Sequence, residues 1–552
     1  MTMQIKSQLL YHLPKTPQCI KLRALKYLKN LNEDHFDEKH PHLKKIKRAQ
    51  NISIKTTKRI HAGSFFSFLK KNGKYLALLT LQDEARNLRR IKSLLKPCLK
   101  LSSFQAAFTP VKIIKPLQKL ELLAFTPVAE ESLVLPKTKF PHHHFPFLRR
   151  IKINANFSCS EIAEYFYQSC HRGSRASFLE IELHLEADLH ADVTLWSNVV
   201  ALKCKINENT PQFFVKSLQE KLSKLQTLDL TFEKNFQAEN LLSIFAKNPL
   251  LNTLNLTIQN CSSNEPLKLQ TADISPLYLT NLSLNLFNIP LEAIIISSNG
   301  GFPGEIHLFP WLRNINQLQK FSFNIVAAEE NIYKWQTAII CSLLENQKHL
   351  TNVILQINLN TVSGLKFSEQ GYDLDLVAVF DALNCSSHSL EYLSVQAQTI
   401  SFNKSQQLIY DTFSFPKLRE FVIYMSKMPN TFQPTQLIDP SIFPALEIFH
   451  SKIILLIDIF HAFRVMKKLA QMKSLKELEI SMASNPSDLD ELNEIFDPLF
   501  SIKTLKKLSL EVTTCSLSQK EVEQFYRERK TQLSELEFYI ILFGYKYYLK
   551  KT

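Results

Sequence analysis

The chain has 552 residues, of which 45% are hydrophobic, and its formal net charge is +15. One hydrophobic core does not extend over so many residues, so we expect several domains or a repeat array. The best candidate for a membrane span, Ile453 to Phe460, is short and carries Asp458, which excludes a transmembrane helix there. The nine cysteines form no CxxC pair and no secretory signal precedes them, so we expect a soluble, cytoplasmic protein with reduced thiols.

The positive charge belongs to the first quarter of the chain. Residues 1–150 contain 30 Lys and Arg against 9 Asp and Glu, a net charge of +21, whereas residues 151–552 contain 36 against 42, a net charge of −6. Such asymmetry favours a contact with nucleic acid, an acidic protein or an anionic surface, and the alternative is a solvated charged segment. The candidate anion-binding residues are Lys44, Lys45, Lys47, Arg48, Arg86, Arg89 and Arg90.

Residues 1–75 are expected to form a basic, partly helical region that includes the amphipathic stretch "CIKLRALKYLKN". Three further readings stay open. The stretch has features of a mitochondrial presequence, "LKKIKR" at residues 43–48 has those of a nuclear localisation signal, and residues 1–60 have the length of a short helical ligase-docking module. In the last case the protein would be similar to F-box substrate adaptors of ubiquitin ligases.

An eight-residue phrase with apolar residues at positions 1, 4, 6 and 8 returns along the chain, first clearly as "LQTLDLTF" at residues 225–232. It predicts a half-buried strand whose positions 3, 5 and 7 face away from the core. Its eleven starts are Leu225, Leu251, Leu279, Leu318, Leu350, Leu390, Leu418, Leu446, Leu475, Leu505 and Leu533. Intervals of 26 to 40 residues indicate a solenoid over residues 225–552, and weaker starts predict divergent repeats over residues 76–224.

Between the phrases the apolar spacing becomes helical, as in residues 239–248, 333–346, 490–500 and 518–530. Ser518 and Glu521 have the spacing of a capping box at a helix start. Each unit is therefore a strand followed by a helix. Stacked units would form an α/β solenoid, with a parallel sheet on one face and helices on the other.

The L-x-x-L-x-L phrase at this period resembles the leucine-rich repeat superfamily, in particular its long-repeat branch similar to ribonuclease inhibitor. The resemblance implies a protein-binding solenoid and is nearly silent on activity. The family usually carries Asn or Cys at position 9, but here only Asn358 matches, so the buried backbone groups need other partners. Glycine-containing stretches near residues 287–317 and 358–389 predict insertions into the repeat.

No nucleotide loop, nucleophile elbow or metal-ligand spacing occurs in the sequence, so we expect no enzyme activity, no cofactor and no metal. The expected function is that of a protein–protein interaction scaffold that binds its partner on the sheet face. The alternatives are the F-box-like adaptor and a nucleic-acid-associated protein that uses the basic N-terminal region.

The expected partner-binding residues lie at outward positions of the later repeats. One apolar and aromatic group is followed by an acidic stripe, which favours a basic partner. The apolar and aromatic group, including one histidine, comprises Ile354, Tyr392, Val422, Tyr424, Ile448 and His450, and the acidic stripe comprises Glu477, Glu479, Glu511, Glu535 and Glu537.

Overall fold

The fold is described from a computed structural model of the chain. It consists of two compact units, Met1–Leu228 and Asp229–Thr552. The first unit is described only at its strands and at a few residues beside them. In the second unit the described residues are 229–233, 244, 248–259, 278–287, 315, 317–327, 331–359, 374–397, 400–401, 413–425, 439–456, 459–483, 488–512, 517–530, 537–542 and 545–549.

The first unit contains eight strands that pair in sequence order, each parallel to the next. They are β1 (Ile20–Arg23), β2 (Ile52–Thr56), β3 (Leu76–Leu81), β4 (Ser103–Ala106), β5 (Leu122–Phe125), β6 (Arg150–Ala155), β7 (Glu180–Leu185) and β8 (Val199–Ile206). Two of them lie within residues 1–75, which the sequence predicted to be partly helical. The register between β6 and β7 aligns Arg150 with Glu180 and Lys152 with Glu182.

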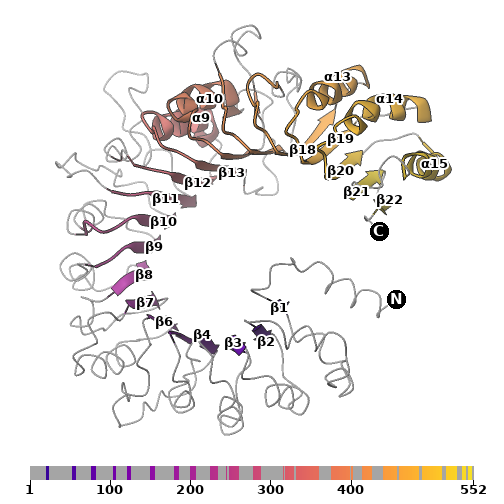
Figure 1. The fold of residues 1–552 in the computed structure, drawn as a ribbon. Coiled ribbons are helices and arrows are strands. Elements are labelled where there is room, and N and C mark those ends of the chain that lie inside the picture. Colours follow the sequence, from indigo (N-terminus) through magenta and orange to yellow (C-terminus); the bar gives the residue numbers. More distant parts are fainter. Residues whose placement is uncertain are drawn as a thin grey trace, which may run out of the picture. The chain divides into compact units, whose positions relative to one another are not determined.

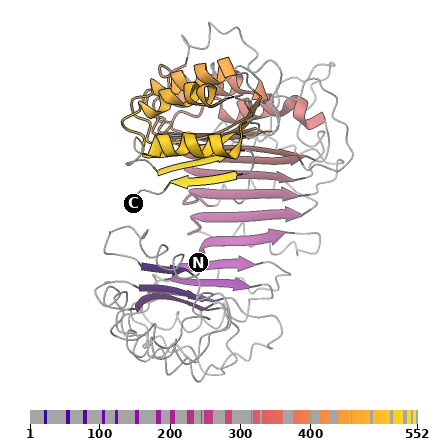
Figure 2. The ribbon, with the colours of Figure 1, turned by 90° about the vertical axis from the view of Figure 1, so that its right-hand side faces the viewer.

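The second unit is built on eleven parallel strands that also pair in sequence order (Figures 1 and 2). They are β9 (Thr227–Glu233, at the boundary between the units), β10 (Thr253–Gln259), β11 (Asn281–Phe287), β12 (Lys320–Ala327), β13 (Asn352–Leu359), β15 (Tyr392–Ala397), β17 (Glu420–Met425), β18 (Ile448–Leu456), β19 (Glu477–Ala483), β20 (Lys507–Val512) and β21 (Glu537–Leu542). A further strand, β22 (Tyr545–Leu549), pairs antiparallel with β21. An open parallel sheet with one strand per repeat is compatible with the predicted solenoid.

The alternation of apolar and polar residues decides which face of the sheet each side chain occupies. In β10, Leu254, Leu256 and Ile258 are fully buried, while Asn255 and Thr257 between them are half-buried on the opposite face. The register keeps equivalent positions aligned from strand to strand, so that Leu254 lies beside Leu282 of β11. The prediction that positions 1, 4, 6 and 8 point into the core is confirmed for β9, β10 and β11.

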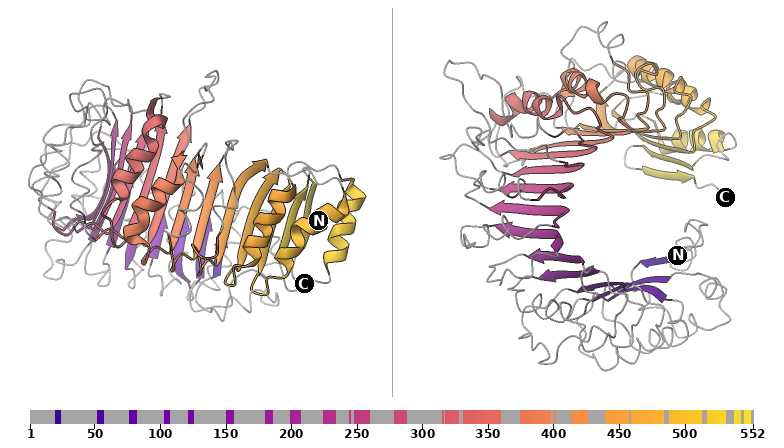
Figure 3. Two further views of the ribbon diagram at one scale, coloured as in Figure 1. Left: turned by 90° about the horizontal axis from the view of Figure 1, so that it is seen from above. Right: turned by 60° about the vertical axis from the view of Figure 1, so that its left-hand side comes forward.

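Helices cover one face of this sheet, and in the described part of the unit none lies on the other face (Figures 1 and 3). The helices are α9 (Asn331–Leu344), α10 (Leu376–Leu383), α13 (Ile459–Ala470), α14 (Leu489–Phe500) and α15 (Gln519–Lys530). Three short elements lie near α10: the 3-10 turn Asn384–Ser386 and the paired strands β14 (Leu374–Asp375) and β16 (Ile400–Ser401).

The helices predicted at residues 333–346, 490–500 and 518–530 are confirmed as α9, α14 and α15. The capping box is present as well, because the Glu521 backbone amide donates to Ser518 Oγ at 3.4 Å and the Ser518 amide donates to the Glu521 carboxylate at 2.7 Å. The structure differs from the sequence prediction in the expected insertion at 358–389. Its second half contains α10, whose side chains from Leu376 to Leu383 are mostly buried, with Asp375 as N-cap.

A turn precedes β10, β17, β18, β19 and β20 and leads directly into each strand. The amide of the first leucine donates to the carbonyl three residues earlier, for example from Leu418 to Phe415 at 3.1 Å and from Leu505 to Ile502 at 3.2 Å. The residue that supplies this carbonyl is buried in each repeat in which the turn is described, as Phe443 and Met472 also show. A buried residue three places before the first leucine therefore recurs in these repeats.

Backbone and hydroxyl groups form hydrogen bonds between successive repeats. The backbone carbonyl at position 2 of a repeat accepts hydrogen bonds from two backbone amides of the next repeat. The Thr280 carbonyl, for example, accepts from the amide of Gln319 at 2.8 Å and from the amide of Lys320 at 2.9 Å. Threonine hydroxyls add bonds between units, such as Thr351 Oγ1 to the Gln319 carbonyl at 3.1 Å. Position 9 still belongs to the strand in β10 to β13, where Phe287 pairs with Val326, so its backbone groups are satisfied by the sheet.

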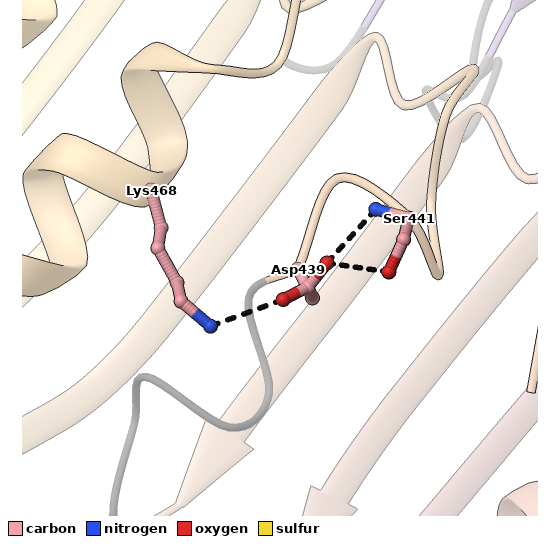
Figure 4. Close-up of polar contacts among 3 residues, drawn as sticks. All are labelled: Asp439, Ser441 and Lys468. Atoms are coloured by element: carbon pink, nitrogen blue, oxygen red, sulfur yellow. Dashed lines mark hydrogen bonds and ion pairs between the residues drawn. The ribbon is translucent and has the colours of Figure 1, made fainter. Parts of the chain in front are cut away.

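An ion pair ties α13 to the turn that precedes β18 (Figure 4). Asp439 accepts hydrogen bonds from the amide of Ser441 at 2.9 Å and from its hydroxyl at 2.6 Å, and Lys468 Nζ on α13 donates to it at 3.1 Å. Burial acts to raise the pKa of Asp439, but these hydrogen bonds outweigh it and hold the pKa below its ordinary value. The carboxylate is therefore part of the packing between this helix and the sheet.

Candidate functional site

The outward face of the second unit consists of the side chains at positions 3, 5 and 7 of its strands. The register from β10 to β18 is continuous, so each position forms a row across these strands, such as Asn281, Lys320, Asn352 and Tyr392 at position 3. Between β18 and β19 the register shifts after Ser451, so only positions 3 and 5 stay aligned there. We divide the face into two sectors. The amide sector comprises Thr253, Asn255, Thr257, Asn281, Ser283, Asn285, Lys320, Ser322, Asn324, Asn352, Ile354 and Gln356, on β10 to β13.

The second sector, the tyrosine–glutamate sector, covers β15 to β20 and contains most of the predicted partner-binding residues. The side chains of this sector that the structure describes are Tyr392, Ser394, Gln396, Glu420, Val422, Tyr424, Ile448, His450, Glu477, Glu479, Ser481, Lys507, Ser509 and Glu511. The register places Ile354, Ser394, Val422 and His450 in one row, so the predicted apolar group occupies neighbouring strands.

The amide sector is joined by side-chain hydrogen bonds across the strands. Asn281 Nδ2 donates to Thr253 Oγ1 at 3.0 Å, and Asn285 Nδ2 donates to Thr257 Oγ1 at 3.5 Å. These bonds order short polar side chains on a flat surface, which leaves little conformational entropy to be lost when a ligand binds.

A concavity of about 380 Å³ lies where the amide sector meets the tyrosine–glutamate sector. The side chains around it include Asn255, Ser283, Lys320, Asn352 and Tyr392, and none of its ten lining residues carries a carboxylate. Its size is within the range of sites that hold a few side chains or a small ligand.

Tyr392 lies at the edge of this concavity and is half-buried. Burial raises the pKa of its hydroxyl, a hydrogen bond with Ser394 opposes the rise, and the carboxylate of Glu420 adds to it. The group therefore stays protonated at neutral pH and can act as a hydrogen-bond donor.

Not every residue of the predicted apolar group is accessible. Ile354, Tyr392, Tyr424, Ile448 and His450 are half-buried. Val422, by contrast, is only 5% exposed although it points outward, and Ser394 beside it in the register is 7% exposed. Val422 therefore supports its neighbours more than it offers a contact surface of its own.

Lysine and serine side chains moderate the predicted acidic stripe. Lys507 Nζ lies 3.2 Å from the Glu477 carboxylate, and Ser481 Oγ donates to Glu511 at 2.8 Å. Glu479 is half-buried in the same region. The register aligns Glu537 with Lys507. Glu535 lies outside the described residues, and β21 aligns two residues later than the predicted start at Leu533 implied.

Sequence reasoning passed over Lys320, which the start at Leu318 already placed at an outward position. It also passed over Leu250 and Tyr278, whose exposed fractions are 53% and 56%. Both residues directly precede the first leucine of neighbouring units, so the same offset from the repeat would have identified them. Exposed large apolar side chains at equivalent positions favour an interaction surface beside the amide sector.

The candidate anion-binding residues, from Lys44 to Arg48 and from Arg86 to Arg90, lie outside the described residues. Within the described part of the chain no cluster of His, Cys, Asp and Glu is suited to a metal ion, and no helix has the length and apolarity needed to span a membrane. No model of a known protein family matches the sequence, and no curated protein shows significant similarity to it.

Proposed function

We propose that the protein is a non-enzymatic interaction scaffold, similar in design to leucine-rich repeat proteins, that binds a partner protein on the outward face of its second unit. The observation that carries this proposal is the arrangement of that face. It is free of described helices, is ordered by cross-strand hydrogen bonds, and presents Tyr392 and Tyr424 half-buried on neighbouring strands.

An extended face of this kind suits a macromolecular partner better than a small substrate. Catalytic sites usually enclose the reacting atoms and exclude water, whereas this face spreads its polar groups over many strands. Half-buried tyrosines surrounded by polar groups are typical of the residues in which binding energy is concentrated. Among the described side chains of the tyrosine–glutamate sector, glutamates outnumber lysines, which favours a partner with basic groups.

The proposal is tested by proximity labelling in the native cell, followed by titration of the purified partner against the full chain and its Tyr424→Ala variant. A loss of affinity in a variant that unfolds at the same urea concentration supports binding on this face. Full affinity of the variant, together with labelling that maps only to residues 1–150, would place the partner elsewhere.

Charge segregation supports a second candidate function, an anion contact through residues 1–150. Their net charge of +21 should attract heparin, RNA or anionic vesicles. We expect binding of the full chain to an RNA homopolymer to weaken steeply with salt, and replacement of Lys44, Lys45, Lys47 and Arg48 by glutamine to reduce the salt slope by about 3. Replacement of Lys503 and Lys506, which are exposed in the second unit, is the control. An unchanged slope in the first variant would show that these four residues are only solvated.

A further inference from the structure

Two lysines occupy the same row of the outward face but differ in their partners. Lys507 on β20 is paired with Glu477 at 3.2 Å. Lys320 on β12 lies between Asn281 and Asn352 in the register, and it makes no ion pair with any described residue. Lys320 is exposed and lines the concavity, and no lining residue carries a carboxylate that would neutralise its charge.

The groups beside Lys320 are suited to binding a carboxylate. Asn352 uses its side-chain oxygen to accept from the Thr351 hydroxyl at 2.8 Å, which turns its amide nitrogen to the role of a donor. Tyr392 supplies a hydroxyl donor on the next strand. A lysine, an amide nitrogen and a phenol that converge on one concavity satisfy the several acceptor positions of a carboxylate.

We propose that this concavity binds an aspartate or glutamate side chain of an extended segment of the partner protein, with Lys320 as its charge partner and with Asn352 and Tyr392 as hydrogen-bond donors. This inference rests on the proposed function. It adds that the bound segment carries an acidic residue where it enters the concavity.

The charges of the whole face complement such a segment. From β12 to β19 there are five steps between strands, or about 24 Å at about 4.8 Å each. An extended segment of about seven residues covers this length. The acidic residue that enters the concavity is therefore expected to lie about seven residues from the basic residues that face Glu477 and Glu479. Leu250 and Tyr278, beside the amide sector, add an apolar contact at the end that carries the acid.

The test uses zero-length carbodiimide cross-linking, which joins a lysine amine to a carboxylate only when the two are in contact. The full chain is mixed with an octaglutamate peptide, and the cross-linked lysines are identified by mass spectrometry. We expect Lys320 to be joined to the peptide well above the level of the exposed Lys503 and Lys506. Tyr392→Phe and Asn352→Leu should each lower the yield at Lys320 by about tenfold, which is the size of one charge-assisted hydrogen bond.

One matched variant and one competitor serve as controls. Gln356→Leu alters an outward residue that does not line the concavity, so the yield at Lys320 should not change. Free glutarate at equal carboxylate concentration should compete poorly, because it lacks the neighbouring backbone of a polypeptide. The inference is overturned if Lys320 reacts no more than Lys503, if Gln356→Leu lowers the yield as much as Asn352→Leu, or if glutarate competes as well as the peptide. If Tyr424→Ala still weakens binding of the physiological partner, the proposed function stands without the carboxylate assignment.

Discussion

The amide sector and the tyrosine–glutamate sector are built on strands of the same sheet, yet their outward side chains are buried to different degrees. In β10 and β11 buried and half-buried residues alternate strictly. In β15 and β17 the pattern breaks, because Ser394 and Val422 point outward and are nevertheless buried. Each lies two residues from a tyrosine on the same face, Tyr392 or Tyr424. The period of two determines where a side chain points, whereas the size of its neighbours determines how much of it solvent reaches.

The largest expected loss of stability distinguishes the face of the sheet to which a side chain points from the degree to which solvent reaches it. Leu393 is fully buried in the core, and its replacement by alanine should lower the free energy of unfolding by about 2–5 kcal/mol through lost transfer energy and the cavity that remains. Val422→Ala, on the outward face, should cost about 1–2 kcal/mol because the surrounding tyrosines can relax toward solvent. Ser394→Ala should cost at most about 1 kcal/mol, since it removes one hydrogen bond with Tyr392.

Urea unfolding of the three variants measures this order. Equal losses for Leu393→Ala and Ser394→Ala would contradict the assignment of the two strand faces. A loss for Val422→Ala as large as that for Leu393→Ala would show that the tyrosines enclose Val422 as tightly as the core encloses Leu393.

Periodicity explains why much of the sheet could be predicted and why two helices could not. The strand phrase has a strong period of two, and α9, α14 and α15 have amphipathic spacing. The sequence of α10, "LVAVFDAL", is apolar on nearly all sides because the helix is largely buried, so it lacks a helical stripe. For α13 the apolar run at residues 453–460 hides the change from β18 to helix.

The candidate site could be predicted in position but not in chemistry. The outward rows follow from the repeat, so Tyr392, Tyr424 and Glu477 were found from their spacing alone. The concavity and the ion pair of Lys507 depend on which side chains meet across neighbouring strands. The register between strands decides this, and the register depends on the loops that connect the repeats. Lys320 differs from Lys507 only through its neighbours, which no single strand phrase contains.

The two tyrosines sharpen the comparison of the sectors as binding surfaces. Tyr392→Ala and Tyr424→Ala should each weaken binding of the physiological partner by about 1–3 kcal/mol without unfolding the protein, because half-buried aromatic anchors contribute most where water is excluded. Asn285→Ala, in the amide sector, serves as the control and should change affinity little. Calorimetric titration of the purified partner measures the three variants, and full affinity of both tyrosine variants would show that the tyrosine–glutamate sector is not the recognition surface.

The helix-covered side of the sheet offers a pH-dependent test in which the outward face takes no part. Asp439→Asn should lower the free energy of unfolding by about 1 kcal/mol at pH 7, since it weakens the contacts with Ser441 and Lys468. The pKa of Asp439 is lowered in the folded protein, so its stabilising contribution is present above the unfolded pKa and is lost as pH falls through the folded pKa.

Urea unfolding at a series of pH values measures this contribution. The difference between the wild-type protein and the Asp439→Asn variant should therefore shrink below about pH 4. Glu521→Gln, at the exposed capping box of α15, is the comparison. A difference for Asp439→Asn that stays constant down to pH 2 would show that its carboxylate is not the titrating group.

The smallest expected effect returns to the two lysines that share a row of the outward face. Lys507→Gln should lower the free energy of unfolding by about 0.2–1 kcal/mol at low salt, because it removes an exposed ion pair, and the loss should vanish at high salt. Lys320→Gln removes no ion pair with a described residue and should leave the free energy of unfolding unchanged at either salt concentration. A double-mutant cycle with Glu477 isolates the first effect. If Lys320→Gln were as destabilising as Lys507→Gln and equally sensitive to salt, Lys320 would have a carboxylate partner within the chain, and the concavity would have no unpaired charge to offer to an acidic segment.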